Sequence, residues 1–143
     1  MNDRRINFLG FPVDNLTSEQ LLEKIDYFVN HGIKCQIVAL NANKLWQAQR
    51  DPKLRDILLQ AELVIPEYAI VWGARILGTP LVEHVGGIML MRRILEVASK
   101  KKYKLYFLGA RPYIVETMVR RLKSEMPTLT ISGWHHGYFD SKD

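Results

Sequence analysis

Two segments of the sequence share a pattern that indicates an α/β fold, IVALNAN at residues 37–43 and LVIPEY at residues 63–68. In each, a short apolar run typical of a buried parallel strand stops at polar residues, Asn41 and Asn43 in the first and Glu67 in the second. Ligands of open α/β sheets bind in the crevice at the carboxyl ends of the strands. These polar residues are therefore predicted to face a ligand.

Strand and helix patterns alternate along the whole chain. Strands are predicted at residues 5–11, 34–40, 62–66, 103–108 and 128–133. Helices are predicted after the capping box at residues 17–20, at residues 42–50 and 68–77, and from residues 51, 86 and 112 onward. This order predicts an α/β fold, a Rossmann-like parallel sheet with helices on both faces.

The composition is that of an ordinary globular domain. The chain has 143 residues, 48% hydrophobic and 24% charged, without repeats or linkers, which favours a single domain over residues 1–143. Its one cysteine, Cys35, falls within a predicted strand, so the chain alone builds neither a disulfide framework nor a cysteine metal site. No apolar run approaches the roughly 18 residues that suggest a membrane span. We expect a cytoplasmic setting.

The net charge of +5 has two interpretations. Basic clusters at residues 100–104 and 120–123 either attract phosphates, anionic lipid or nucleic acid, or are solvated helix ends that complement the helix dipole. We expect no nucleic-acid partner. No metal site is expected either, because H-E-x-x-H is missing and the adjacent His135 and His136 would point to opposite faces of a strand.

Two glycine-containing turns are candidate ligand loops. The sequence lacks G-x-G-x-x-G and the P-loop, which disfavours ordinary NAD and ATP sites. Gly109 and Arg111 lie between a strand and a helix, where backbone N–H groups and the helix end favour a diphosphate. The alternative is a tight turn with a surface arginine. Gly86 and Gly87 are likewise either a close-approach loop or a flexible helix start.

The polar residues at the two strand ends have alternative roles as well. Glu67 is a candidate general base that takes a proton from an attacking hydroxyl, or a helix-terminal glutamate that stabilises the dipole. Asn41 and Asn43 either bind sugar hydroxyls or a pyrophosphate oxygen, or cap the following helix.

The order of six motifs resembles the WecG/TagA/CpsF glycosyltransferases along nearly the entire chain. These motifs are VALNA at residues 38–42, RDP at 50–52 with Leu54 and Arg55, AELVIPE at 61–67, HVGG at 84–87, FLGARP at 107–112 and HGYF at 136–139. Each motif is weak alone, and the six in this order and spacing are specific.

The resemblance implies an activity. Members of this family are inverting, metal-independent enzymes that move an N-acetylhexosamine, typically N-acetylmannosamine, from a UDP-sugar to undecaprenyl-diphosphate-linked N-acetylglucosamine. They work at the cytoplasmic face of the cell membrane, and their products enter teichoic acid linkage units, enterobacterial common antigen or capsule. No cofactor is expected, because the UDP-sugar is a substrate and the sequence has no D-x-D metal motif.

The resemblance also assigns roles to residues. Glu67 would be the catalytic base, Asn41 would orient a sugar, and Gly109 and Arg111 would hold the nucleotide or its diphosphate. The other expected substrate-binding residues are Ala39, Asn43, Tyr68, His84, Gly86, Gly87, Gly137 and Tyr138.

This chain departs from the family at both strand ends. The family usually has Thr-Leu-Asn and Pro-Asp-Gly there, whereas this chain has Ala39 for the threonine and Glu67-Tyr68 for Asp-Gly. The glutamate keeps the carboxylate one methylene further out, and the alanine removes a hydroxyl. Tyr68 adds an aromatic wall, which suggests altered sugar or acceptor choice.

The resemblance also bears on the extent of the chain. Full-length members continue into a C-terminal region with further substrate-binding residues and a basic appendage that contacts the membrane. We expect this chain to lack that region and to be inactive alone, and the family implies an oligomer without locating its interface. Two other hypotheses stay open: a catalytically decayed nucleotide-sugar-binding or scaffolding relative, and a dinucleotide-dependent Rossmann enzyme.

Overall fold

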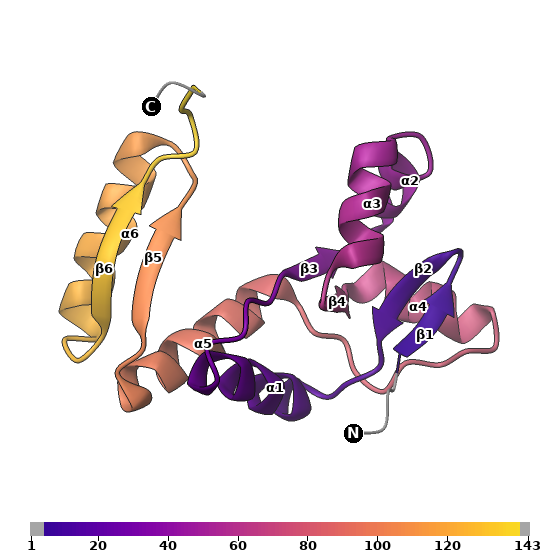
Figure 1. The fold of residues 1–143 in the computed structure, drawn as a ribbon, viewed down its shortest axis with the longest axis horizontal. Coiled ribbons are helices and arrows are strands. Elements are labelled where there is room, and N and C mark those ends of the chain that lie inside the picture. Colours follow the sequence, from indigo (N-terminus) through magenta and orange to yellow (C-terminus); the bar gives the residue numbers. More distant parts are fainter. Residues whose placement is uncertain (1–4, 141–143) are drawn as a thin grey trace. The chain divides into compact units, whose positions relative to one another are not determined.

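The structure is a computed structural model that describes residues 5–140. Contacts divide the chain into two compact units, Met1–Met91 and Arg92–Asp143. Six helices and six strands lie within the described residues, and the strands form three two-stranded sheets (Figure 1). Two of these sheets are parallel, which confirms the predicted α/β fold with parallel strands.

Most of the elements belong to the first unit. It contains β1 (Arg5–Phe8), β2 (Phe11–Asp14), α1 (Ser18–Asn30), β3 (Ile37–Leu40), α2 (Ala42–Ala48), α3 (Pro52–Gln60), β4 (Leu63–Pro66) and α4 (Tyr68–Ile76). Helix α5 (Gly87–Lys101) begins in the first unit and ends in the second. The second unit continues with β5 (Lys104–Leu108), α6 (Pro112–Glu125) and β6 (Thr130–His135).

The predicted first strand at residues 5–11 is confirmed only for residues 5–8, because the chain then turns into a hairpin and begins a second strand at Phe11. Strands β1 and β2 pair antiparallel, with Phe8 opposite Phe11. The two turn residues, Leu9 and Gly10, have positive φ angles of 50° and 86°, as a tight hairpin turn requires. Leucine rarely adopts this conformation, so a turn at Leu9 is hard to predict from sequence.

Strands β3 and β4 form the parallel pair predicted from the opening segments. Ile37 lies opposite Leu63 and Leu40 lies opposite Pro66. Strand β3 is shorter than predicted, and Cys35 precedes it rather than lying within it. The surrounding core contains Phe8, Phe11, Val13, Leu40, Leu45, Ala48, Leu58, Ala61, Val64, Ile70 and Ala74.

A buried carboxylate joins the hairpin to β4. Asp14 is 4% exposed and accepts two hydrogen bonds from the Arg5 guanidinium, at 3.2 and 2.9 Å. Its Oδ2 also accepts a 2.7 Å hydrogen bond from the backbone N–H of Val64. One side chain therefore neutralises a cation and satisfies a buried backbone donor, which fixes β2 beside β4.

The second unit contains the other parallel pair, β5 and β6, covered by helices on one face. Its core contains Leu95, Ala98 and Leu129, with Tyr103, Leu105, Phe107, Leu122, Met126 and Ile131 packed against them. Tyr106 and Leu108 lie on the other face and are 60% and 63% exposed. The last strand runs to His135, two residues beyond the predicted end at residue 133.

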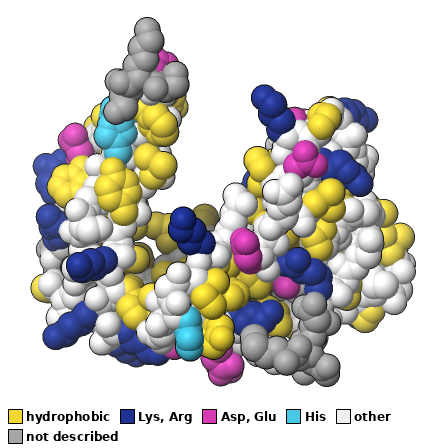
Figure 2. All heavy atoms as spheres, in the orientation of Figure 1, with side chains coloured by type: hydrophobic (Ala, Val, Ile, Leu, Met, Phe, Trp, Pro, Cys, Tyr) yellow, Lys and Arg dark blue, Asp and Glu magenta, His cyan; other side chains and the backbone are white. Residues whose placement is uncertain are grey.

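The surface carries dispersed positive charge. Figure 2 shows Lys and Arg side chains at several separate places on the face in view, among exposed hydrophobic side chains. Among residues 5–140, no helix combines the length and apolar character needed to cross a membrane.

Candidate functional site

The predicted polar residues of the first unit lie side by side at the carboxyl ends of β3 and β4. Leu40 and Pro66 are the paired last residues of these strands, and Asn41 and Glu67 follow them directly. The backbone N–H of Glu67 donates a 2.9 Å hydrogen bond to the carbonyl of Leu40. The parallel ladder therefore places both polar residues at one edge of the pair.

Glu67 is the N-cap residue of α4, and its carboxylate makes no capping hydrogen bond. Its backbone carbonyl begins the helix by accepting from Ile70 and Val71, at 2.9 and 3.2 Å. The side chain is half-buried. Because the carboxylate is not used to hold the helix end, its oxygens are available to accept a proton from a bound hydroxyl.

Asn41 acts as a helix cap, which was one of its two predicted roles. Its side-chain oxygen accepts a 2.8 Å hydrogen bond from the backbone N–H of Lys44 and so begins α2. The amide nitrogen is the group that Asn41 offers to a ligand. Asn43 lies within the first turn of α2 and is exposed. The structure therefore places Asn43 on the helix surface rather than at the strand end.

A distant segment, residues 84–87, joins the two strand ends. The backbone N–H of Val85 donates to the carbonyl of Pro66 at 3.3 Å. The His84 ring meets the Tyr68 ring edge to face, with centroids 5.5 Å apart. A side chain at Gly86 would lie 3.3 Å from the His84 ring, so this glycine gives the imidazole room.

Ala39 and Gly87 pack against each other beside this cluster. A Cβ on Gly87 would stand 3.7 Å from the Cβ of Ala39, which is ordinary van der Waals contact. The alanine that replaces the family's threonine thus faces the first residue of α5. The structure brings together seven predicted residues, Ala39, Asn41, Glu67, Tyr68, His84, Gly86 and Gly87, which we call the strand-end site.

Lys44, which no sequence pattern singled out, lies beside the strand-end site. Its Nζ donates a 2.7 Å hydrogen bond to the carbonyl of Ala39, so a half-buried ammonium lies at the end of β3. A cation in the first turn of a helix opposes the helix dipole. That unfavourable position is the sequence signal that could have identified Lys44 as a functional candidate. An ammonium there is suited to an anionic ligand group.

The predicted residues of the second unit meet at the carboxyl ends of β5 and β6. The N–H of Gly109 donates to the carbonyl of His135 at 3.0 Å, and the N–H of Gly137 donates to the carbonyl of Ala110 at 2.9 Å. Arg111 is the exposed N-cap residue of α6, and Tyr138 is 68% exposed. A basic side chain at a helix N-terminus is suited to a diphosphate.

The neighbouring histidines correct one prediction. The rings of His135 and His136 lie together, with centroids 4.2 Å apart, instead of on opposite faces. The reason is that β6 ends at His135, so strand alternation does not extend to His136. Within residues 5–140, no group of three or more His, Cys, Asp or Glu side chains is placed to hold a metal ion.

The turn after β5 gives a stability prediction. Gly109 has a φ of 120°, a backbone conformation that side chains rarely adopt. We expect Gly109→Ala to lower the free energy of unfolding by about 1–3 kcal/mol, the usual cost of such strain. Urea titration of the protein measures it. Ala110→Gly is the matched control, because Ala110 itself has a φ of 68° and a glycine relieves it. Equal losses in both variants would contradict the prediction.

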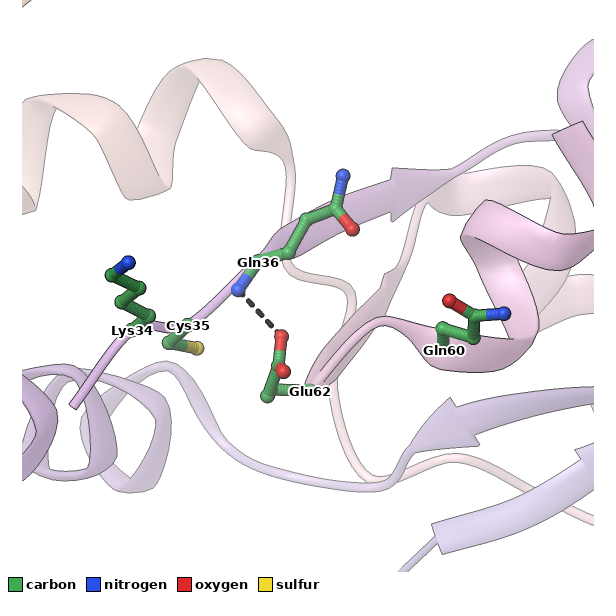
Figure 3. Close-up of a pocket in the computed structure, with 5 residues that line it drawn as sticks. All are labelled: Lys34, Cys35, Gln36, Gln60 and Glu62. Atoms are coloured by element: carbon green, nitrogen blue, oxygen red, sulfur yellow. Dashed lines mark hydrogen bonds between the residues drawn. The ribbon is translucent and has the colours of Figure 1, made fainter. Parts of the chain in front are cut away.

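An open depression of about 510 Å³ lies at the opposite, amino ends of β3 and β4. It is lined by Lys34, Cys35, Gln36, Gln60 and Glu62. Figure 3 shows the Glu62 carboxylate accepting a 2.7 Å hydrogen bond from the backbone N–H of Gln36. Burial, followed by the negative charge of Glu62, raises the pKa of the Cys35 thiol, which makes that thiol a poor nucleophile. This depression is separate from the strand-end site.

The chain is similar to known proteins over almost all of its length. A model of the glycosyl transferase WecG/TagA/CpsF family matches residues 6–143. A relative from Bacillus spizizenii is named N-acetylglucosaminyldiphosphoundecaprenol N-acetyl-beta-D-mannosaminyltransferase. It is 29% identical over 140 residues, which cover 96% of this chain and 54% of the relative.

Relatives from two other bacteria carry the same name. The Bacillus subtilis protein is 26% identical over 99% of this chain and 56% of its own length. The Staphylococcus aureus protein is 28% identical over 99% of this chain and 57% of its own length. The chain therefore spans about half the length of the curated relatives it matches. Because the family model matches nearly all of its residues, the chain belongs to the WecG/TagA/CpsF glycosyl transferase family.

Proposed function

We propose that this chain is part of an inverting glycosyltransferase of cell-envelope polysaccharide or teichoic acid biosynthesis. The enzyme would move an N-acetylhexosamine, N-acetylmannosamine in the first instance, from a UDP-sugar to undecaprenyl-diphosphate-linked N-acetylglucosamine. The names of the relatives support the transferred sugar and the acceptor. The UDP donor, a reaction without metal, and a location at the cytoplasmic face of the membrane belong to the proposal.

One observation carries this proposal: the Glu67 carboxylate, which makes no capping hydrogen bond, lies at the paired ends of β3 and β4. Glu67 removes the proton from the acceptor hydroxyl. The resulting oxygen forms a bond to the anomeric carbon of the donor, and the bond from that carbon to the diphosphate oxygen breaks. UDP leaves with the bonding electrons, and the configuration at the anomeric carbon inverts.

Other residues bind and orient the substrates. The amide nitrogen of Asn41 donates to a sugar oxygen, and the Lys44 ammonium offers positive charge at the end of β3. On the second unit, Arg111 and the N-terminus of α6 bind a diphosphate. Tyr68 and His84 form an aromatic wall beside Glu67 that limits which sugar or acceptor fits.

The second candidate is a relative that binds nucleotide sugars without transferring them. Ala39 favours it, because this residue lacks the hydroxyl that the family threonine would place beside Gly87. Both candidates bind nucleotide sugars, and only the first transfers the sugar to an acceptor.

Calorimetry and a transfer assay on the full-length protein separate the two candidates. We expect UDP and UDP-N-acetylmannosamine to bind, and UDP to be released when an N-acetylglucosaminyl-diphospholipid acceptor is added. Binding without transfer would favour the binding relative. Failure to bind either nucleotide would contradict both candidates, and a parallel NAD titration tests the remaining dinucleotide hypothesis.

A further inference from the structure

Helix α4 is apolar on the face that packs and on the face that does not. Its nine residues, Tyr68–Ile76, include one charged side chain, Arg75. Ile70 and Ala74 are 1% and 0% exposed and belong to the core of the first unit. An ordinary surface helix would carry polar residues opposite such a face.

Three large apolar side chains occupy the opposite face instead. Tyr68, Trp72 and Ile76 are spaced four residues apart, which aligns them along one side of the helix. They are 63%, 53% and 77% exposed. We call these three residues the α4 stripe. At about 1.5 Å per residue, the stripe is roughly 12 Å long. Large apolar side chains that are exposed together on one side of a helix are typical of binding surfaces.

The α4 stripe begins at the strand-end site. Tyr68 directly follows Glu67, and its ring contacts that of His84. Apolar exposure continues after Gly87, because Ile88 and Met89 at the start of α5 are 87% and 61% exposed. Exposed apolar residues therefore follow the strand-end site on two elements, and the α4 stripe leads away from the carboxylate.

We propose that the α4 stripe binds the isoprenoid chain of the acceptor, next to its diphosphate. This inference rests on the proposed function, which supplies an acceptor with a sugar at one end and a long apolar chain at the other. When the sugar hydroxyl reaches Glu67, the chain must leave the site along some surface. The α4 stripe offers an apolar surface that begins beside Glu67, where Tyr68 contacts His84.

The test is a chain-length series of binding measurements on the full-length protein. Calorimetry compares dimethylallyl, farnesyl and geranylgeranyl diphosphate, which share a head group and differ in apolar length. We expect affinity to rise by about tenfold or more along the series, because each added isoprene unit buries apolar surface. In the double variant Trp72→Gln/Ile76→Gln, we expect the affinity to be nearly independent of chain length.

A matched control uses another exposed tryptophan of the same unit. Trp46 on α2 is 57% exposed, close to the value for Trp72, and lies outside the α4 stripe. Trp46→Gln should keep the full dependence on chain length. Circular dichroism checks that the double variant is folded, and the affinity for dimethylallyl diphosphate should be the same in all variants.

Two results would overturn the inference. One is wild-type affinity that does not change with chain length. The other is a double variant whose affinity rises with chain length as steeply as that of the wild type, which we call an unchanged slope. If that unchanged slope accompanies loss of a wild-type dimer on sedimentation, the α4 stripe is instead an interface between copies. Transfer to a short-chain acceptor is measured separately. If sugar is transferred but affinity does not depend on chain length, the proposed function stands and this inference is wrong. If affinity depends on chain length but no sugar is transferred, the α4 stripe binds the chain and the proposed function is wrong.

Discussion

Replacing Glu67 by Gln is expected to lower the kcat of sugar transfer by about 10²–10⁴-fold, the usual contribution of a general base. The amide has nearly the shape of the carboxylate and does not accept the proton of the acceptor hydroxyl. The Glu67 side chain makes no capping hydrogen bond, so the substitution leaves the start of α4 intact. UDP release at saturating acceptor, with full-length protein, measures the effect.

A matched control lies at the other end of the same segment. Glu62 precedes β4 at its amino end, where its carboxylate accepts from the backbone N–H of Gln36. Glu62→Gln makes the same chemical change away from the strand-end site, and its turnover should stay near wild type. Glu67→Asp keeps a carboxylate and should retain measurable turnover. Wild-type turnover in Glu67→Gln would remove Glu67 from the mechanism.

The largest expected effect on stability comes from Asp14→Ala. This change should lower the free energy of unfolding by about 3 kcal/mol, the lower end for breaking a buried ion pair, because Arg5 is 28% exposed and keeps hydrogen bonds to the carbonyls of Ala61 and Glu62. Asp14 is 4% exposed, and its loss leaves the Arg5 guanidinium and the buried N–H of Val64 without this acceptor. Urea titration followed by circular dichroism measures the loss.

An exposed ion pair provides the comparison for Asp14. Arg121 and Glu125 pair on the surface of α6, where their side chains are 77% and 56% exposed. Water screens such pairs, so Glu125→Ala should change the free energy of unfolding by less than about 1 kcal/mol. Similar losses of unfolding free energy in the two variants would show that the hydrogen bonds of Asp14 do not stabilise the fold more than a surface ion pair does.

The strand ends were predictable from the sequence because an apolar run and the polar residue that ends it coincide there. Apolar runs that stop at Asn41 and Glu67 indicate buried parallel strands, and the paired register confirms that indication. The capping box at Thr17 is also confirmed, with the Thr17 side chain accepting from the N–H of Gln20. Such signals are local, since each depends on residues only a few positions apart.

Features that depend on tertiary contacts could not be predicted in this way. Only Gly10 marks the hairpin turn in the sequence, and the placement of the Lys44 ammonium at the end of β3 depends on the folded backbone. Periodicity gives the inward face of a helix but not the depth of burial. In α1, Leu21 is fully buried, while Val29 near the other end of the helix is 48% exposed.

The exposure of side chains on α4 was likewise not predictable from the sequence. Ile70 and Ala74 of this apolar helix are buried, but Ile76 is 77% exposed. A helix with apolar residues on all sides is usually buried, and the sequence alone does not reveal that one of its faces is uncovered. The α4 stripe therefore became visible only in the structure.

In the proposed mechanism one carboxylate, Glu67 at the end of β4, activates the acceptor hydroxyl for direct displacement of UDP. The most direct measurement is the anomeric configuration of the first disaccharide formed, determined by NMR on a short-chain acceptor with full-length protein. A single displacement inverts the donor configuration, so a β-linked product from an α-linked UDP-sugar is predicted. A product that keeps the configuration of the donor would contradict the account.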